Sequence, residues 1–232
     1  MNKFLELNNI SKTFETSKKL KVIKNLSYNF KKGKIYSLMG PSGSGKSTLL
    51  NLISLIDKPS NGIIKFNKHK INYDDKEQND QLRAKKIGIV YQQNNLLPDF
   101  TSLENIYLAS LSINNNKNLA ISKAKQLLQK IGLSSRADHY PSQLSGGEAQ
   151  RISIARAIIN DPEIILADEP TGSLDMKTAK IIFNLLKDQK RSDRLIIFAT
   201  HNRFFGNKAD CLLEILNGKI KSSNGWVFTT KL

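Results

Sequence analysis

A glycine-rich loop with one lysine lies between an apolar segment and a helical pattern. The apolar segment is Ile35–Met39, the helical pattern runs from Thr48 to Leu55, and the loop reads Gly40, Pro41, Ser42, Gly43, Ser44, Gly45, Lys46, Ser47 and Thr48. In this setting backbone N–H groups converge on an anion, and the helix N-terminus adds partial positive charge. We expect Lys46 to contact the β and γ phosphates of a nucleotide and the Ser47 hydroxyl to ligate Mg²⁺. The flanking strand and helix argue against the alternative, a glycine-rich turn that binds nothing.

Two acidic residues, Asp168 and Glu169, follow the apolar run Ile164–Ala167. In an open sheet of parallel strands, ligands bind at the carboxyl ends of the strands, which is where these acids are expected. We expect Asp168 to hold Mg²⁺ through water and Glu169 to orient and deprotonate an attacking water. A strand that ends in acids is common, so the pair gains its meaning from the phosphate loop that precedes it.

The segment Leu144, Ser145, Gly146, Gly147 and Glu148 opens a helical pattern that extends to Ile159. Taken alone it is a good helix-capping sequence. Behind a phosphate loop and ahead of a strand ending in Asp-Glu, it resembles the signature motif of the ATP-binding-cassette (ABC) superfamily. The resemblance spans about residues 4–221. Further positions match the same family in order: Gln92 its Q-loop glutamine, Ser173–Asp175 its D-loop, His201 its switch histidine, and Phe14 the aromatic residue that stacks on adenine.

The resemblance implies ATP and Mg²⁺ as cofactors and a homodimer in which two ATP molecules lie between head-to-tail chains. It assigns Glu169, His201 and Gln92 to catalysis, with Gln92 also sensing Mg²⁺, and places Ser145, Gly146, Gly147 and Glu148 against the partner's nucleotide. Each minor match has a plain structural alternative: a lone histidine is usually a turn or cap, a lone glutamine a surface amide, and Phe14 a core residue.

A guanine-recognition pattern also occurs, at residues Asn207–Asp210. An enzyme of that kind needs an Asp with Gly three residues later, and the sequence contains none. The nucleotide is therefore expected to be ATP.

Short apolar runs and turn residues predict the elements that position these groups. Strands are expected at 4–10, 21–30, 34–39, 62–66, 87–91, 163–167 and 195–199. The last three are nearly continuous in apolar character, as in strands covered on both faces. Thr101 and Glu104 form a capping-box pattern, and a second helix is expected over 119–131. The fold class is α/β: a P-loop NTPase core with a parallel sheet, an N-terminal antiparallel β subdomain and an inserted helical subdomain at about 93–145, with about 1–92 and 146–232 forming the rest of one domain.

Composition narrows the function classes. Of 36 basic residues against 20 acidic ones, a net charge of +16, only seven are Arg, and the lysines are scattered. This pattern favours a solvated Lys-rich surface, with an anionic membrane as the main alternative, and we expect no nucleic-acid partner. The longest stretches without charged residues, 87–98 and 105–116, fall short of the ~20 apolar residues of a membrane span. The single cysteine, Cys211, lies in an apolar run and is expected to be a small buried residue.

Two function classes remain: the ATPase subunit of a membrane transporter, and an ABC ATPase that acts on ribosomes or DNA. The sequence has neither a second cassette nor long coiled coils, so the transporter is favoured. Motif spellings around Gln92, Asp168 and His201 resemble the branch that contains the lipoprotein-releasing LolD ATPases, the MacB-type exporters and the FtsE proteins. That resemblance implies permease subunits similar to LolC and LolE, a peripheral position on the cytoplasmic side of the inner membrane, and a contact surface at Leu96, Leu97 and Phe100, unless these three residues pack inside the insertion.

Overall fold

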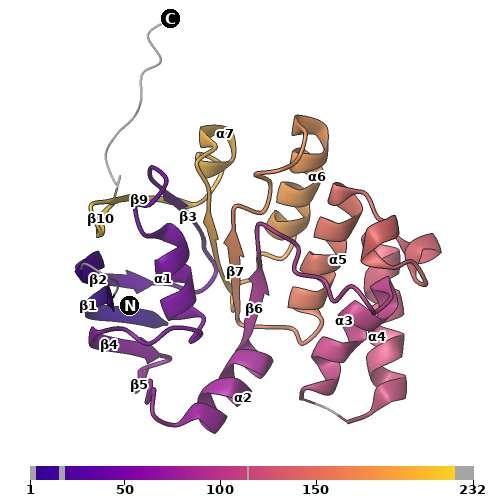
Figure 1. Ribbon diagram of the computed structural model, residues 1–232, viewed down its shortest axis with the longest axis horizontal. Coiled ribbons are helices and arrows are strands. Elements are labelled where there is room, and N and C mark those ends of the chain that lie inside the picture. Colours follow the sequence, from indigo (N-terminus) through magenta and orange to yellow (C-terminus); the bar gives the residue numbers. More distant parts are fainter. Residues whose placement is uncertain (1–3, 16–18, 114, 223–232) are drawn as a thin grey trace, which may run out of the picture.

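The computed structural model describes residues 4–15, 19–113 and 115–222. They form two sheets flanked by helices (Figure 1). The strands are β1 (Leu5–Glu15), β2 (Lys19–Phe30), β3 (Ile35–Met39), β4 (Asn61–Phe66), β5 (His69–Lys70), β6 (Ile87–Val90), β7 (Ile164–Asp168), β8 (Leu195–Ala199), β9 (Cys211–Leu216) and β10 (Lys219–Ser222). The α-helices are α1 (Lys46–Ile53), α2 (Lys76–Lys86), α3 (Ser102–Leu111), α4 (Lys117–Lys130), α5 (Gly146–Ile158), α6 (Met176–Lys187) and α7 (Arg203–Gly206), with short 3-10 turns at Ser134–Arg136 and Pro141–Gln143.

The main sheet brings the predicted site residues to one edge. Its strand order is β10-β9-β3-β8-β7-β6, and all neighbours pair in parallel except β9 and β10. On β7, Ile164 and Leu166 pack in the same apolar cluster as α1, whereas Ile165 and Ala167 face α5 and α6 on the other side. Alternate side chains thus point to two covered faces, which explains the continuous apolar run.

The smaller sheet is antiparallel, in the order β2-β1-β4-β5. Helix α1 lies between the two sheets (Figure 1), where Leu49, Leu52 and Ile53 are each at most 1% exposed. These side chains share one cluster with residues of both sheets, including Leu7 and Ile197. The helix that carries Lys46 is therefore fixed on two sides.

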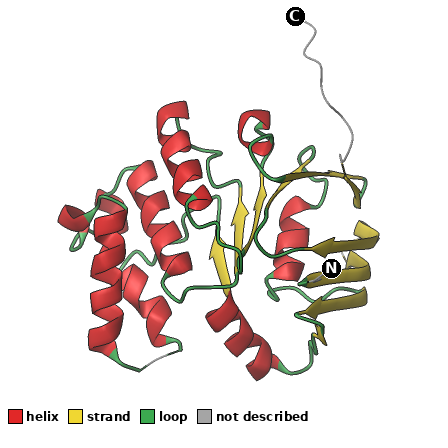
Figure 2. Cartoon of the chain, turned by 180° about the vertical axis from the view of Figure 1, so that it is seen from behind, coloured by secondary structure: helices red, strands yellow, loops and turns green. Residues whose placement is uncertain are grey.

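A helical layer covers the other side of the main sheet, away from the smaller sheet (Figure 2). Helices α3, α4 and α5 share a separate apolar cluster that includes Ile106, Ala124 and Ile152. The predicted insertion of 93–145 contains α3 and α4 but not α5, although α5 packs against both. Residues 1–3, 16–18 and 223–232 of the predicted core range lie outside the described residues.

The predicted fold class is confirmed, and several element boundaries differ. Strand β1 continues to Glu15 because the register shifts between Leu7 and Ile10, where Asn9 adopts a φ of 49°, and pairing with β2 then resumes. Helix α2 has no counterpart among the specific predictions, since its sequence shows no apolar stripe. Cys211 is half-buried on β9 and not fully buried as expected.

None of the described helices has both the length and the apolar character required to cross a membrane.

Candidate functional site

The phosphate loop, residues 40–48, connects the buried end of β3 to α1. Gly43 and Gly45 have φ values of 75° and 104°, which residues with a side chain rarely adopt. A Cβ added at Gly45 would lie 2.8 Å from Ile23 Cδ1, whereas one added at Gly43 would have no heavy atom within 4 Å. The loop is thus packed against β2 at Gly45 and open beside Gly43.

Polar groups inside this loop lack strong partners. The Lys46 side chain folds back so that its Nζ donates to the carbonyl oxygens of Gly40 (2.9 Å) and Pro41 (3.1 Å), and the residue is only 8% exposed. The Ser44 hydroxyl is buried and has no hydrogen-bond partner among the described residues. A buried ammonium whose hydrogen bonds go to two neutral carbonyls, in the same loop as a hydroxyl that has no partner among the described residues, fits an anion such as a phosphate.

Asp168, the last residue of β7, faces the first turn of α1. Burial raises the pKa of its carboxyl above the ordinary value, while a hydrogen bond with the Ser47 side chain opposes that rise and the charge of Glu169 adds to it. A hydroxyl and a carboxylate side by side are the oxygen ligands that Mg²⁺ prefers. The described residues contain no group of three or more His, Cys, Asp or Glu that could hold a metal ion.

Glu169, His201 and Gln92 come together just beyond the strand ends. His201 Nδ1 lies 2.9 Å from Glu169 Oε1, and Glu169 Oε2 is buried and has no hydrogen-bond partner in the part of the chain that the structure describes. The Glu169 side chain is 11% exposed and that of His201 is 68% exposed. A Cβ added at Gly172 would lie 3.5 Å from both Gln92 Nε2 and Glu169 Cβ, so the Gln92 amide reaches the turn that carries Glu169. The three predicted residues therefore lie close together, and one oxygen of the Glu169 carboxyl group makes no hydrogen bond within the described residues.

The signature segment, residues 144–148, forms the N-terminus of α5. Ser145 Oγ accepts from the Glu148 backbone N–H (3.3 Å), and Glu148 Oε2 accepts from the Ser145 N–H (2.8 Å), a complete capping box. Arg136 Nε also donates to Glu148 Oε1 at 2.9 Å. The hydrogen bonds with Ser145, followed by that from Arg136, lower the pKa of Glu148 to about 2. Glu148 is thus engaged within its own chain.

The two signature glycines differ in what surrounds them. A Cβ added at Gly147 would lie 2.4 Å from Thr178 Cγ2 on α6, whereas at Gly146 the nearest atom, on Leu174, would be 3.6 Å away. Packing of α5 against α6 therefore requires glycine at position 147 whatever else binds there. The space at Gly146 carries no such requirement.

Phe14 lies near the end of β1, apart from the phosphate loop along the chain, and is half-buried. The Lys12 ammonium lies 5.0 Å from its ring centroid, and Phe14 pairs with the exposed Leu20 across β2. Its ring is therefore partly available to a ligand, although residues 16–18 of the adjoining turn lie outside the described residues.

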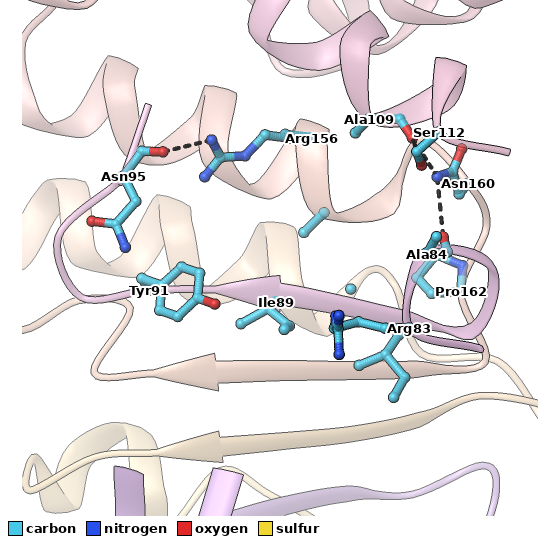
Figure 3. A pocket seen from close by; sticks show the side chains of 13 residues that line it. Arg83, Ala84, Ile89, Tyr91, Asn95, Ala109, Ser112, Arg156, Asn160 and Pro162 are labelled. Carbon is cyan, nitrogen blue, oxygen red and sulfur yellow. Dashed lines mark hydrogen bonds between the residues drawn. The ribbon is translucent and has the colours of Figure 1, made fainter. Parts of the chain in front are cut away.

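The predicted contact surface divides. Leu97 and Phe100 are 44% and 38% exposed, whereas Leu96 packs against the apolar cluster of the helical layer. Nearby is a pocket of about 330 Å³ between α2, β6, α3 and α5 (Figure 3), lined among others by Arg83, Tyr91, Arg156 and Asn160. Leu96 therefore packs inside the helical layer, whereas Leu97 and Phe100 remain candidates for the contact surface.

Sequence reasoning missed several residues that organise the site. Arg136 binds Glu148, and Gln150 binds the Tyr91 carbonyl. Arg156 binds the carbonyls of the residues that follow Gln92. No local sequence pattern marks these three side chains. Asp210, part of the guanine-type pattern, accepts from the Ile35 N–H and pairs with Lys190. That aspartate is therefore used by the fold.

Comparison with known proteins agrees with this geometry. Residues 23–172 match the sequence profile described as ABC transporter. A Rickettsia bellii protein named "Lipoprotein-releasing system ATP-binding protein LolD" is 42% identical over 226 residues, 96% of this chain and 99% of the relative. A protein of the same name from Wigglesworthia glossinidia brevipalpis is 42% identical over 228 residues, 95% of this chain and 97% of the relative.

Among solved structures, the dimeric ATP-binding cassette MJ0796 in a post-hydrolysis state with ADP and Pi gives a TM-score of 0.87 at 36% identity, covering 96% of this chain and 100% of that one. The profile covers more than half of the chain, and the relatives are similar over nearly their full length. From its fold, its phosphate loop and these similarities, the chain belongs to the ABC transporter family, as an ATP-binding subunit that hydrolyses ATP.

Proposed function

We propose that this chain powers the release of lipoproteins from the bacterial inner membrane, acting at the cytoplasmic face through separate membrane subunits. The observation that carries this proposal is the 42% identity, over nearly the full chain, to relatives named for lipoprotein release, together with an intact set of site residues. The membrane work must pass to partners, because no described helix is suited to span a bilayer.

ATP would bind with its phosphates in the loop of residues 40–48, where Lys46 leaves the carbonyls of Gly40 and Pro41 to contact them. The backbone N–H groups at the start of α1 would bind the same phosphates. Ser47, Asp168 and Gln92 would hold Mg²⁺, which when bound would neutralise phosphate charge. Phe14 would stack on adenine, for which its partly exposed ring is suited.

Glu169 is proposed to deprotonate the attacking water. Its oxygen Oε2 has no hydrogen-bond partner among the described residues and would accept the proton once the site opens to water, while His201 would orient the carboxyl group through Oε1. Gln92, which lies beside the helical layer, would change position when Mg²⁺ and nucleotide bind. We propose that the helical insertion, about residues 93–145, moves together with Gln92.

A second copy of the chain is proposed to complete each site. The signature segment lies on a different helix from the phosphate loop, and a solved relative with the same fold is a dimer. In a symmetric head-to-tail pair, Ser145, Gly146 and Gly147 would face the partner's γ-phosphate. Glu148, bound to Arg136 and Ser145, would hold this end of α5 in shape. Hydrolysis would remove the phosphate that joins the halves.

The membrane subunits are proposed to dock at the pocket of Figure 3 and the neighbouring Leu97 and Phe100. Exposed apolar side chains beside a lined pocket suit a partner's helical segment. We propose permeases similar to LolC and LolE as those partners.

Depletion of the chain in its native cell tests the proposal. Lipoproteins destined for the outer membrane should accumulate in the inner membrane, and re-expression of the wild-type chain, but not of Glu169→Gln, should restore sorting. Correct lipoprotein sorting combined with new sensitivity to drugs or toxins would instead indicate a MacB-type exporter.

A further inference from the structure

Residues 91–101, here called the Gln92 segment, join β6 to α3 without forming a helix or strand. Several of its backbone groups, which lack helix or sheet partners, bond to side chains from neighbouring helices instead. At the end near α3 this side chain is that of Asn105, which is 1% exposed: its Oδ1 accepts from the Leu97 N–H (2.8 Å), and its Nδ2 donates to the Leu97 and Phe100 carbonyls. This end of the segment is therefore bound to the helical layer.

The other end of the segment is held by α5. Gln150, 2% exposed, donates from Nε2 to the Tyr91 carbonyl at 3.2 Å. Arg156 donates from Nη2 to the Asn94 carbonyl at 2.8 Å and from Nη1 to the Asn95 carbonyl at 2.6 Å, the second of which is visible in Figure 3. Asn95 turns the chain there with a φ of 48°. Bonds from one helix thus bracket Gln92.

The charge of Arg156 has no role as an ion pair within the described residues, because it bonds only to neutral carbonyls. Burial lowers the pKa of its guanidinium. Partial burial of a cation without an anionic partner costs free energy, so this arrangement needs another explanation. A guanidinium presents several N–H donors in a rigid plane and can fix two carbonyls at once, which an ammonium does less well.

We propose that Arg156 is a positioning residue for ATP hydrolysis. Its guanidinium fixes the carbonyls of Asn94 and Asn95, so that Gln92 is held at the Glu169 turn and moves together with α5. A displacement of Gln92 at one nucleotide then reaches Ser145, at the N-terminus of the same helix, without passing through the sheet. This inference rests on the proposed role of Gln92 in the site.

A double-mutant cycle of Arg156→Met and Gln92→Ala tests this, with steady-state ATP hydrolysis by the purified full chain as the measurement. We expect Arg156→Met alone to lower kcat about tenfold, as lost hydrogen bonds from a charged group would. KM for ATP should change less than about twofold, since the phosphate loop lies on another helix. In the Gln92→Ala background, Arg156→Met should lower kcat by less than about twofold.

The outcomes separate the inference from the proposal beneath it. If Arg156→Met lowers kcat tenfold in both backgrounds, Arg156 acts independently of Gln92 and the inference is overturned while the role of Gln92 stands. If Gln92→Ala leaves kcat unchanged, the role of Gln92 is overturned, and this inference with it.

Two further variants guard against a purely structural effect. Arg156→Lys keeps the charge but can fix only one carbonyl, so kcat should lie between those of wild type and Arg156→Met, about threefold below wild type; a kcat equal to that of wild type overturns the bidentate role. If Arg156→Met does not fold, the same cycle is run with Arg156→Lys, and additivity again overturns the inference. Arg191→Met is the matched control and should leave kcat unchanged. Arg191 lies on the turn before β8, where it pairs with Asp193 and also with Asp161.

Discussion

The N-termini of α1 and α5 serve the same proposed nucleotide chemistry and are built in opposite ways. Helix α1 begins after Gly45 with no side-chain cap and no acidic residue in its first turn. Helix α5 begins after Ser145 with a full capping box and Glu148 in its first turn. The first leaves its N–H groups and positive dipole end available, whereas the second satisfies them within the chain.

This difference indicates which of the two helix N-termini can bind an anion without a second chain. A phosphate at α1 meets unpaired donors and the Lys46 ammonium, but at α5 it meets a helix end whose charge Glu148 already offsets. We therefore expect the signature segment to contribute only when a second chain presents it to a phosphate that α1 already holds. On this proposal, phosphate binding and completion of the site fall to different helix ends of each chain.

The largest expected effects come from residues beside the uncapped N-terminus of α1. Glu169→Gln should lower kcat by about 10²- to 10⁴-fold, the range for a lost general base, while ATP binding is kept. Lys46→Ala should instead weaken ATP binding by about 10- to 100-fold, since a charge-assisted contact is lost. Isothermal titration with ATP and a phosphate-release assay separate the two. Normal hydrolysis by Glu169→Gln would remove Glu169 from its role.

The second effect concerns the capped N-terminus of α5 when two chains form a dimer. Mixing a Ser145→Arg chain with a Lys46→Ala chain should restore about a quarter of the wild-type ATPase rate, because half of randomly formed dimers are mixed and each has one intact site of two. Ser145 is the better signature position to change, since a side chain at Gly147 would collide with Thr178. A mixture as inactive as its parents, with dimers still formed, contradicts the trans arrangement.

A smaller effect separates capping from chemistry. Ser145→Ala and Thr101→Ala each remove the cap of a helix that has a complete capping box, and each should lower the free energy of unfolding by about 1 kcal/mol. Only Ser145→Ala should also lower ATPase activity. Denaturant unfolding and ATPase assays on both variants make the comparison. Equal activity loss in both would mean that Ser145 acts only as a cap.

The smallest effect is on stability and depends on pH. Burial raises the pKa of Asp168 in the folded chain, so its ionisation opposes folding as the pH rises through that value. Asp168→Asn removes this cost. The variant should melt at a higher temperature than wild type near neutral pH, and the gap should close below the ordinary aspartate pKa, where both forms are neutral. A gap independent of pH would point to packing instead.

The parts of the fold that follow local signals could be predicted. Thr101 and Glu104 predicted the start of α3, and they form the complete capping box at its N-terminus. The apolar runs of β7 and β8 indicated strands covered on both faces because both of their faces are indeed packed. The glycines of residues 40–48 are required by the conformation of the loop itself, so the loop could also be predicted from the local sequence.

The remainder depends on contacts between residues distant in the chain. Helix α2 has Asp75 as its N-cap, and Asn79 is its one buried residue, so no apolar period marks it. The bond between Arg136 and Glu148 and those of Arg156 exist only after α5 packs beside the loops. Gly147 shows the opposite error: its match to a motif concealed a packing requirement from Thr178.

Glu169 occupies its place at a cost to the backbone, with a φ of 44°. A glycine or asparagine would adopt this left-handed conformation with less strain. A copy of this gene released from the need to hydrolyse ATP would therefore gain stability by losing its glutamate, and such losses should accumulate early in its divergence.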